Sequence, residues 1–117
     1  MKIKSLLFLI ISIFFALTSN ASTILSNSET ATFKVFGNCG MCKERIEGAL
    51  KKNINIQKAD WNEDTKMISV SYDPQMISLT EIHNIIASVG YDTEKTKGND
   101  AAYKKLHGCC QYERRKS

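Results

Sequence analysis

The stretch FGNCGMCK, residues 36–43, holds Cys39 and Cys42 where a strand pattern changes to a helix pattern. Residues 32–36 before it favour a β-strand, and apolar residues after it recur at helical spacing. A helix N-terminus offers free backbone N–H groups and the positive end of the helix dipole, both of which favour an ionised sulfur. The stretch is therefore typical either of a soft-metal site or of a thiol-disulfide exchange site.

Beyond Cys42 the pattern is that of an amphipathic helix. Apolar side chains recur three or four positions apart, with charged residues on the other faces. The apolar stripe consists of Cys42, Ile46, Ala49 and Leu50. Cys42 therefore begins the buried face, and Cys39, on the preceding loop, is expected to be the more exposed sulfur. We expect the helix N-terminus and Lys43 to lower the pKa of the Cys42 thiol.

A β-hairpin is predicted next. Residues 54–61 and 66–72 are two runs with β-propensity, and apolar residues alternate with serines from Ile68 to Tyr72. The polar link between the runs, residues 62–65, has the composition of a turn. Pro74 closes the hairpin, because proline cannot continue the ladder of strand hydrogen bonds.

A second helix begins with a capping box. Ser78 is followed three residues later by Glu81, and apolar residues then recur at helical spacing until Gly90. These apolar residues are Ile82, Ile85, Ile86 and Val89. His83 lies off this stripe, so we expect it to face solvent rather than to bind a ligand.

Residues 91–96 predict a short last strand. The order of elements is then strand, helix, strand, strand, helix, strand. This order predicts an α+β protein with a ferredoxin-like βαββαβ sandwich, in which two helices cover one face of a four-stranded antiparallel sheet.

The first residues have the pattern of an export signal. A basic start with Lys2 and Lys4 precedes an apolar run and small residues up to Ala21. We expect cleavage after Ala21, which makes residues 1–21 a signal peptide and the protein periplasmic. The apolar run has about 12 residues against about 20 for a membrane span, so no permanent span is expected after cleavage. A membrane anchor is the alternative.

Size and charge limit the remaining chain. The 117 residues carry a formal net charge of +4, and two of these charges leave with the signal. So small an excess gives no indication of nucleic-acid binding. The predicted organisation is a disordered leader at 22–29, one domain at 30–97 and a C-terminal tail at 98–117 that contains cysteines.

The four cysteines form two close pairs, whereas a disulfide framework would spread them along the chain. The second pair, Cys109 and Cys110, follows His107 in the tail. Two interpretations stay open: an auxiliary soft-metal site that includes His107, or a tail without a role. Residues 99–106 have the composition for one or two helical turns.

These features together resemble the heavy-metal-associated domain of copper chaperones, copper-exporting ATPases and the periplasmic mercury-binding protein. The shared features are the order of elements, the CxxC between first strand and first helix, the hairpin that ends at Pro74, and the Gly90-Tyr91 step. The resemblance covers about residues 30–97. It implies that Cys39 and Cys42 bind Cu(I), or Hg(II) in the mercury branch.

The resemblance also concerns residues beside the site. Tyr91 matches a position where members place an aromatic residue or a lysine next to the metal. Members usually carry a methionine two residues before the first cysteine, and this chain has Gly37 there. Met41 lies instead between the two cysteines, where its thioether would assist the metal or cover the site.

The chemistry favours metal binding. Two thiolates can hold Cu(I) or Hg(II) by themselves, whereas zinc requires four ligands. We therefore predict an exported copper chaperone or scavenger, not an enzyme, that passes Cu(I) by ligand exchange to a membrane metal transporter or another metallochaperone. The protein is expected to be a monomer or a metal-bridged dimer.

Two alternatives remain. One is a mercuric-ion scavenger of a detoxification system. The other is a thiol-disulfide oxidoreductase, a class whose thioredoxin-like members have an aromatic residue just before the CxxC, where this chain has Asn38.

Overall fold

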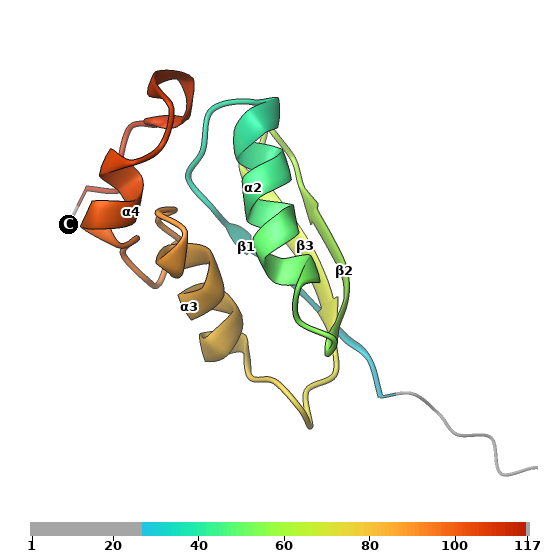
Figure 1. The fold of residues 1–117 in the computed structure, drawn as a ribbon. Coiled ribbons are helices and arrows are strands. Elements are labelled where there is room, and N and C mark those ends of the chain that lie inside the picture. Colours follow the sequence, from blue (N-terminus) through green and yellow to red (C-terminus); the bar gives the residue numbers. More distant parts are fainter. Residues whose placement is uncertain (1–26, 117) are drawn as a thin grey trace, which may run out of the picture.

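The computed structural model describes residues 27–116, which form an antiparallel sheet with helices packed on one face (Figure 1). The elements, in chain order, are β1 (Glu29–Lys34), α2 (Gly40–Lys51), β2 (Ile56–Trp61), β3 (Met67–Tyr72), α3 (Leu79–Ser88), α4 (Asp100–Lys104) and the 3-10 helix η2 (Gly108–Cys110). The predicted signal peptide and most of the predicted leader lie outside the described residues. Within residues 27–116, every helix is too short or too polar to cross a bilayer.

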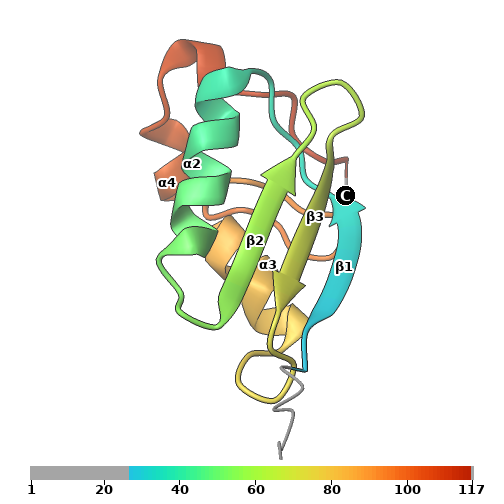
Figure 2. The same ribbon diagram turned by 90° about the vertical axis from the view of Figure 1, so that its right-hand side faces the viewer.

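β3 is the central strand of the sheet, with β1 on one side and β2 on the other (Figure 2). Both neighbours run antiparallel to it. Alternate residues of β3 are buried, as the sequence predicted. The buried residues are Ile68, Val70 and Tyr72.

The hairpin turn between β2 and β3 lies at the same end of the sheet as the CxxC loop. The Asn62 side chain shapes this turn by accepting hydrogen bonds from the backbone N–H groups of Asp64 and Thr65. Lys66 then adopts a left-handed conformation, with φ 63°. Its carbonyl accepts the backbone N–H of Val35, which joins the turn to the segment leading into the CxxC loop.

α2 and α3 cover the same face of the sheet (Figures 1 and 2). The apolar stripe of α2 is buried as predicted, through Cys42, Ile46 and Leu50. α3 begins with the predicted capping box, because the Ser78 hydroxyl accepts the Glu81 N–H and the Glu81 carboxylate accepts the Ser78 N–H. These two helices complete the core against the sheet.

The predicted fourth strand, residues 91–96, is present only as a single antiparallel bridge between Val35 and Thr93. The chain then turns, because the Thr93 hydroxyl accepts the backbone N–H of Thr96 and ends the extended run. In the described residues the sheet therefore has three strands. The bridge lies beside β1, at the edge where a ferredoxin-like fold has its last strand.

His83 is buried, so the expectation that it faces solvent was wrong. Its exposed fraction is 1%, and its ring stacks on Phe33 with 4.1 Å between ring centroids. Its Nδ1 lies 2.6 Å from the Thr93 hydroxyl oxygen. The turn at Thr93 covers the face of α3 that carries His83, which lies outside the apolar stripe of the helix. Burial lowers the pKa of His83.

The tail, residues 98–116, folds back onto the domain (Figure 1). At the start of the tail, the backbone at Gly98 passes close to the backbone at Gly90. A side-chain carbon at position 98 would lie 2.8 Å from the Gly90 backbone. Gly90 itself has φ +100°, a conformation that favours glycine. α4 follows inside the predicted helical segment, and the chain then returns along the domain to the N-terminal end of α2 (Figures 1 and 2).

Candidate metal centre

Cys39 and Cys42 lie at the N-terminus of α2 and differ in burial. Cys39 is the N-cap residue, with extended backbone, and is partly exposed. Cys42 is completely buried and begins the apolar stripe of the helix. The backbone N–H of Asn38 donates to the Cys42 sulfur at 3.4 Å. The two sulfurs are therefore unequal in the way that the sequence predicted, with Cys39 the more accessible.

The helix N-terminus acts on Cys39. Backbone N–H groups of Cys42 and Met41 lower the pKa of the Cys39 thiol, because unpaired amides of a first helical turn stabilise negative charge. Lys43, which we expected to activate the neighbouring Cys42, has other partners. Its Nζ lies 2.7 Å from both the Asp60 and the Glu47 carboxylates. Lys43 thus ties α2 to β2.

A third cysteine, Cys110 of η2, lies beside the CxxC pair. The Sγ atoms of Cys39, Cys42 and Cys110 are all within 4.8 Å of one another. Cys110 is completely buried, and burial together with Cys42 raises the pKa of its thiol to about 12. All four cysteines are free thiols. Three sulfurs gathered in this way are a ligand set for a soft metal ion.

The other predicted tail residues lie outside this sulfur cluster. The His107 side chain is exposed. The Cys109 thiol is also exposed, 3.9 Å from the Cys110 sulfur and 4.0 Å from the Met41 sulfur. Of the three tail residues that the sequence singled out, only Cys110 is among the clustered sulfurs.

Cys109 contacts the CxxC loop through its backbone instead. Its carbonyl accepts a hydrogen bond from the Asn38 side-chain amide at 3.3 Å. The same carbonyl accepts the Cys39 thiol at 3.7 Å. The tail and the loop are therefore joined directly at the place where the sulfurs meet.

Tyr91 lies next to the sulfurs, in the position that the family resemblance implied. It is completely buried, and its hydroxyl has no hydrogen-bond partner among the described residues. Burial, with Cys42 and Cys110 nearby, raises the pKa of this phenol. Its ring stacks on Tyr112 of the tail, with 5.5 Å between centroids. A protonated phenol here is a donor available to a thiolate.

Gly37 leaves room for Trp61 beneath the CxxC loop. A side-chain carbon at position 37 would lie 2.9 Å from the Trp61 ring and 3.4 Å from Cβ of Cys42. The indole is completely buried, and its N–H donates to the Val35 carbonyl at 3.0 Å. This chain therefore supports the loop with an indole from β2, where family members usually place a methionine.

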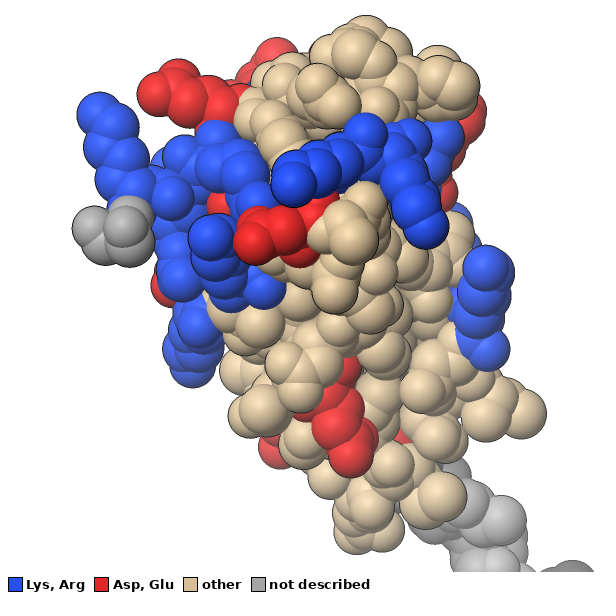
Figure 3. All heavy atoms as spheres, turned by 60° about the vertical axis from the view of Figure 1, so that its left-hand side comes forward, with Lys and Arg blue, Asp and Glu red and all other residues tan. Residues whose placement is uncertain are grey.

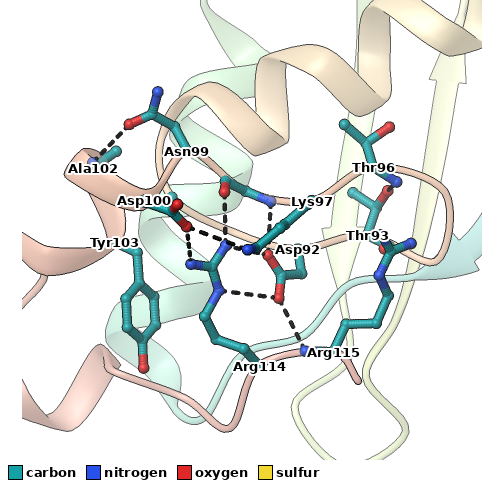
Figure 4. Close-up of polar contacts among 12 residues, drawn as sticks. Asp92, Thr93, Thr96, Lys97, Asn99, Asp100, Ala102, Tyr103, Arg114 and Arg115 are labelled. Carbon is teal, nitrogen blue, oxygen red and sulfur yellow. Dashed lines mark hydrogen bonds and ion pairs between the residues drawn. The ribbon is translucent and has the colours of Figure 1, made fainter. Parts of the chain in front are cut away.

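The tail is anchored by a buried carboxylate, Asp92 (Figure 4). Asp92 accepts hydrogen bonds from the Arg114 guanidinium and the Gly98 N–H, both at 2.7 Å, and from the Arg115 N–H at 2.9 Å. Burial alone would raise the pKa of Asp92, but these donors outweigh it and hold the pKa below its usual value. The C-terminal residues are thus fixed close to the sulfurs.

A basic groove of about 550 Å³ runs beside the CxxC loop. Gly37 and Asn38 line one part of it, and Lys66 extends its ammonium to 3.5 Å from the Asn38 carbonyl. The positively charged residues of the groove are Lys34, Lys66, Arg114, Arg115 and Lys116. Figure 3 shows Lys and Arg side chains gathered on one side of this face. Glu113 also lines the groove, so positive charge predominates over negative charge beside the CxxC loop.

Comparison with known proteins gives the family. The model of the heavy-metal-associated domain matches residues 32–92, more than half of the chain. The chain belongs to the heavy-metal-associated domain family. The matched segment includes Cys39 and Cys42 and ends before Cys110.

Similar proteins share this segment. The copper chaperone CopZ of Staphylococcus aureus (strain Newman) is 33% identical over 54 residues, which are 46% of this chain and 79% of that protein. A copper-exporting P-type ATPase of Staphylococcus saprophyticus is 32% identical over 71 residues, 60% of this chain but 9% of the ATPase. Oxidized MerP from Ralstonia metallidurans CH34 has a similar structure, with a TM-score of 0.54 at 25% identity over 57% of this chain and 94% of that one.

Sequence reasoning found the three clustered cysteines but not their arrangement. It left two interpretations of Cys110 open, an auxiliary soft-metal site with Cys109 and His107 or a tail without a role. The approach of Cys110 to Cys39 depends on contacts between residues about 70 positions apart, which no local pattern reports.

Proposed function

We propose that this protein binds Cu(I) through Cys39 and Cys42 and acts as a copper chaperone or scavenger. The observation that carries the proposal is the pair of neighbouring sulfurs at the N-terminus of α2, inside the segment that matches the family. The copper chaperone and copper-exporting ATPase among its relatives support copper as the ion. Two thiolates suit Cu(I), because it is a soft ion that accepts few ligands.

The unequal burial of the two sulfurs supports delivery by ligand exchange. Cys42 is held in the core, while Cys39 is partly exposed on the loop. A cysteine of the acceptor would approach the ion from the side of Cys39, and its bond to copper would form as the bond to Cys39 breaks. The acceptor we propose is a membrane metal transporter or another metallochaperone.

We also propose that the protein is exported and works in the periplasm. The basic start, the apolar run and Ala21 support removal of residues 1–21. Expression of the full chain followed by mass spectrometry of the periplasmic fraction tests this step. A mature protein that begins at Ser22 is expected, and an intact chain that begins at Met1 in the membrane fraction would contradict it.

A mercury scavenger is the second candidate, because the structure is similar to that of MerP. The same two sulfurs would hold Hg(II), which is also a soft ion. The thiol-disulfide oxidoreductase has less support. Thioredoxin-like enzymes usually have a proline that faces their CxxC. Here the segment with Pro74 joins β3 to α3 at the end of the sheet opposite to the N-terminus of α2 (Figure 2), so this proline does not face the CxxC.

Anaerobic competition between the reduced protein and a chromophoric Cu(I) chelator tests the proposal. The native protein is expected to take one Cu(I) per chain from the chelator. The double variant Cys39→Ser/Cys42→Ser is expected to lose this binding, and Cys109→Ser, at an exposed thiol, is the matched control that keeps it. Unchanged affinity and stoichiometry in the double variant would overturn the proposal. Repeating the competition with Hg(II) ranks the two ions.

A further inference from the structure

We propose that Cys110 is a third ligand of the same ion, so that Cys39, Cys42 and Cys110 form a three-thiolate Cu(I) site closed by the tail. This inference rests on the proposed function and adds a ligand from outside the segment that matches the family, residues 32–92. The tail is then part of the metal centre.

The distances fit three-coordinate binding. A thiolate bond to a metal of this size is about 2.3 Å long, so three sulfurs arranged in a triangle around one ion lie about 4 Å apart. The three Sγ atoms lie within 4.8 Å of one another. The largest separation therefore exceeds that of a three-coordinate site by less than about an ångström.

Cys110 is held in place from both sides along the chain. Its own N–H donates to the His107 carbonyl at 2.8 Å, and its carbonyl accepts the Tyr112 N–H at 2.9 Å. Leu106 and Tyr112 are buried in the core on either side of it. The Asn38 amide and the Cys109 carbonyl join this turn to the CxxC loop. The third sulfur is therefore held in position by contacts within the chain.

The neighbours of Cys109 and Cys110 explain why one of them is the ligand. The two residues are adjacent, yet Cys110 is completely buried beside Cys42 while the Cys109 thiol is exposed. The Cys109 sulfur lies 4.0 Å from the sulfur of Met41, a side chain that is itself 41% exposed. Cys109 thus contributes its carbonyl to the junction, and Cys110 contributes its sulfur.

The charge around the sulfurs suits this ligand set. One Cu(I) with three thiolates carries a net charge of −2. The N-terminus of α2 offers amides and the positive end of its dipole to this charge. The Tyr91 hydroxyl, which has no hydrogen-bond partner among residues 27–116, is a further donor, and the basic groove with Lys66 lies beside the loop. Each of these features stabilises an anionic centre.

X-ray absorption of the reduced full-length protein loaded with one equivalent of Cu(I) tests the inference, together with chelator competition. The native protein and Cys109→Ser are expected to show three sulfurs per copper. Cys110→Ser and Cys110→Ala are expected to show two and to bind Cu(I) at least tenfold more weakly. Copper coordination and affinity unchanged from the native protein in both Cys110 variants would overturn the inference.

Two further measurements separate the possible failures. Cu(I) that still binds to Cys39→Ser/Cys42→Ser would overturn the proposed function, whereas unchanged Cys110 variants overturn only the third ligand. If the Cys110 variants do not fold, hydrogen exchange of the native protein decides. Copper is then expected to slow exchange at residues 107–112, and equal exchange with and without copper contradicts the inference.

Discussion

Trp61 lies beneath the CxxC loop, in the space that a side chain at position 37 would need. Its ring is fixed by the hydrogen bond to the Val35 carbonyl and covered by the Lys66 ammonium, 5.4 Å from the ring centre. Glycine at position 37 lets the loop pass over this rigid ring. The conformation of the loop therefore depends on a pairing of glycine with tryptophan across 24 positions of the chain.

Gly37→Ala is expected to destabilise the protein by about 1–3 kcal/mol, because the added methyl group meets the Trp61 ring and a packed core does not expand freely. In the Trp61→Phe background the cost of Gly37→Ala is expected to be smaller by at least about 0.5 kcal/mol, since the smaller ring leaves room. Urea unfolding of the four proteins measures this coupling.

Gly48→Ala is the matched control for this cycle. Gly48 lies inside α2, and a side-chain carbon there meets nothing within 4 Å. Alanine is expected to stabilise the helix by about 0.5–1 kcal/mol at this position. If Gly37→Ala lowers the free energy of unfolding equally in the native and the Trp61→Phe backgrounds, the Trp61 ring does not support the loop as described.

The tail is attached as an element through buried polar groups. The Tyr112 hydroxyl donates to the Gly90 carbonyl and accepts the Asp92 N–H, both at 2.7 Å. The Tyr103 hydroxyl donates to the Tyr112 carbonyl at 2.8 Å, and the two rings meet edge to face. These bonds link α4, the C-terminal segment and the chain after α3, so that the tail is held as one unit.

Tyr112→Phe is expected to loosen the tail by about 1–3 kcal/mol, because it leaves the buried Gly90 carbonyl and Asp92 N–H without their partner. Hydrogen exchange at residues 99–112 is expected to become faster. Tyr72→Phe is the control, since that hydroxyl makes one longer contact, 3.4 Å, with Glu29. Equal effects of the two substitutions on the tail would contradict this attachment.

Local patterns in the sequence predicted the elements well and the long-range contacts poorly. Ser78 and Glu81 located the start of α3, and the alternation from Ile68 to Tyr72 gave the orientation of β3. The burial of His83 was missed, because the turn that covers it comes from a segment after the helix. The position of Cys110 was missed for the same reason. Hydrophobic periodicity shows which face of a helix or strand is buried, but it does not show which segment of the chain packs against that face.

At the scale of the whole molecule, one residue, Asp92, joins the domain to the tail. The Asp92 backbone carbonyl accepts the Phe36 N–H at 2.9 Å beside the bridge, and its carboxylate accepts hydrogen bonds from Arg114 and Arg115. Arg114 also forms an ion pair with Asp100, and its guanidinium lies over the Tyr103 ring. Protonation of Asp92 would therefore weaken the contact between domain and tail.

Acid is expected to release the tail. Because the pKa of Asp92 is lowered in the folded protein, its contribution to stability is complete above the ordinary carboxyl pKa of about 3.9 and is lost as pH falls through the lower folded value. The free energy of unfolding should therefore fall below about pH 4. The Asp92→Asn variant should be less stable at neutral pH, and its free energy of unfolding should change less over this pH range. The Asp64→Asn variant, changed in the exposed hairpin turn, should keep the native dependence of stability on pH.

In the proposed copper site, a Cys110 thiol tethered by the fold affects which molecules can remove the ion. A group held beside a site acts at an effective concentration of about millimolar or more, without regard to its concentration in solution. Small thiols that diffuse freely would have to exceed this value to displace Cys110. An acceptor protein that docks on the loop brings its own cysteine at a comparable effective concentration. Such a chain would retain its copper among free thiols and yield it to a bound acceptor.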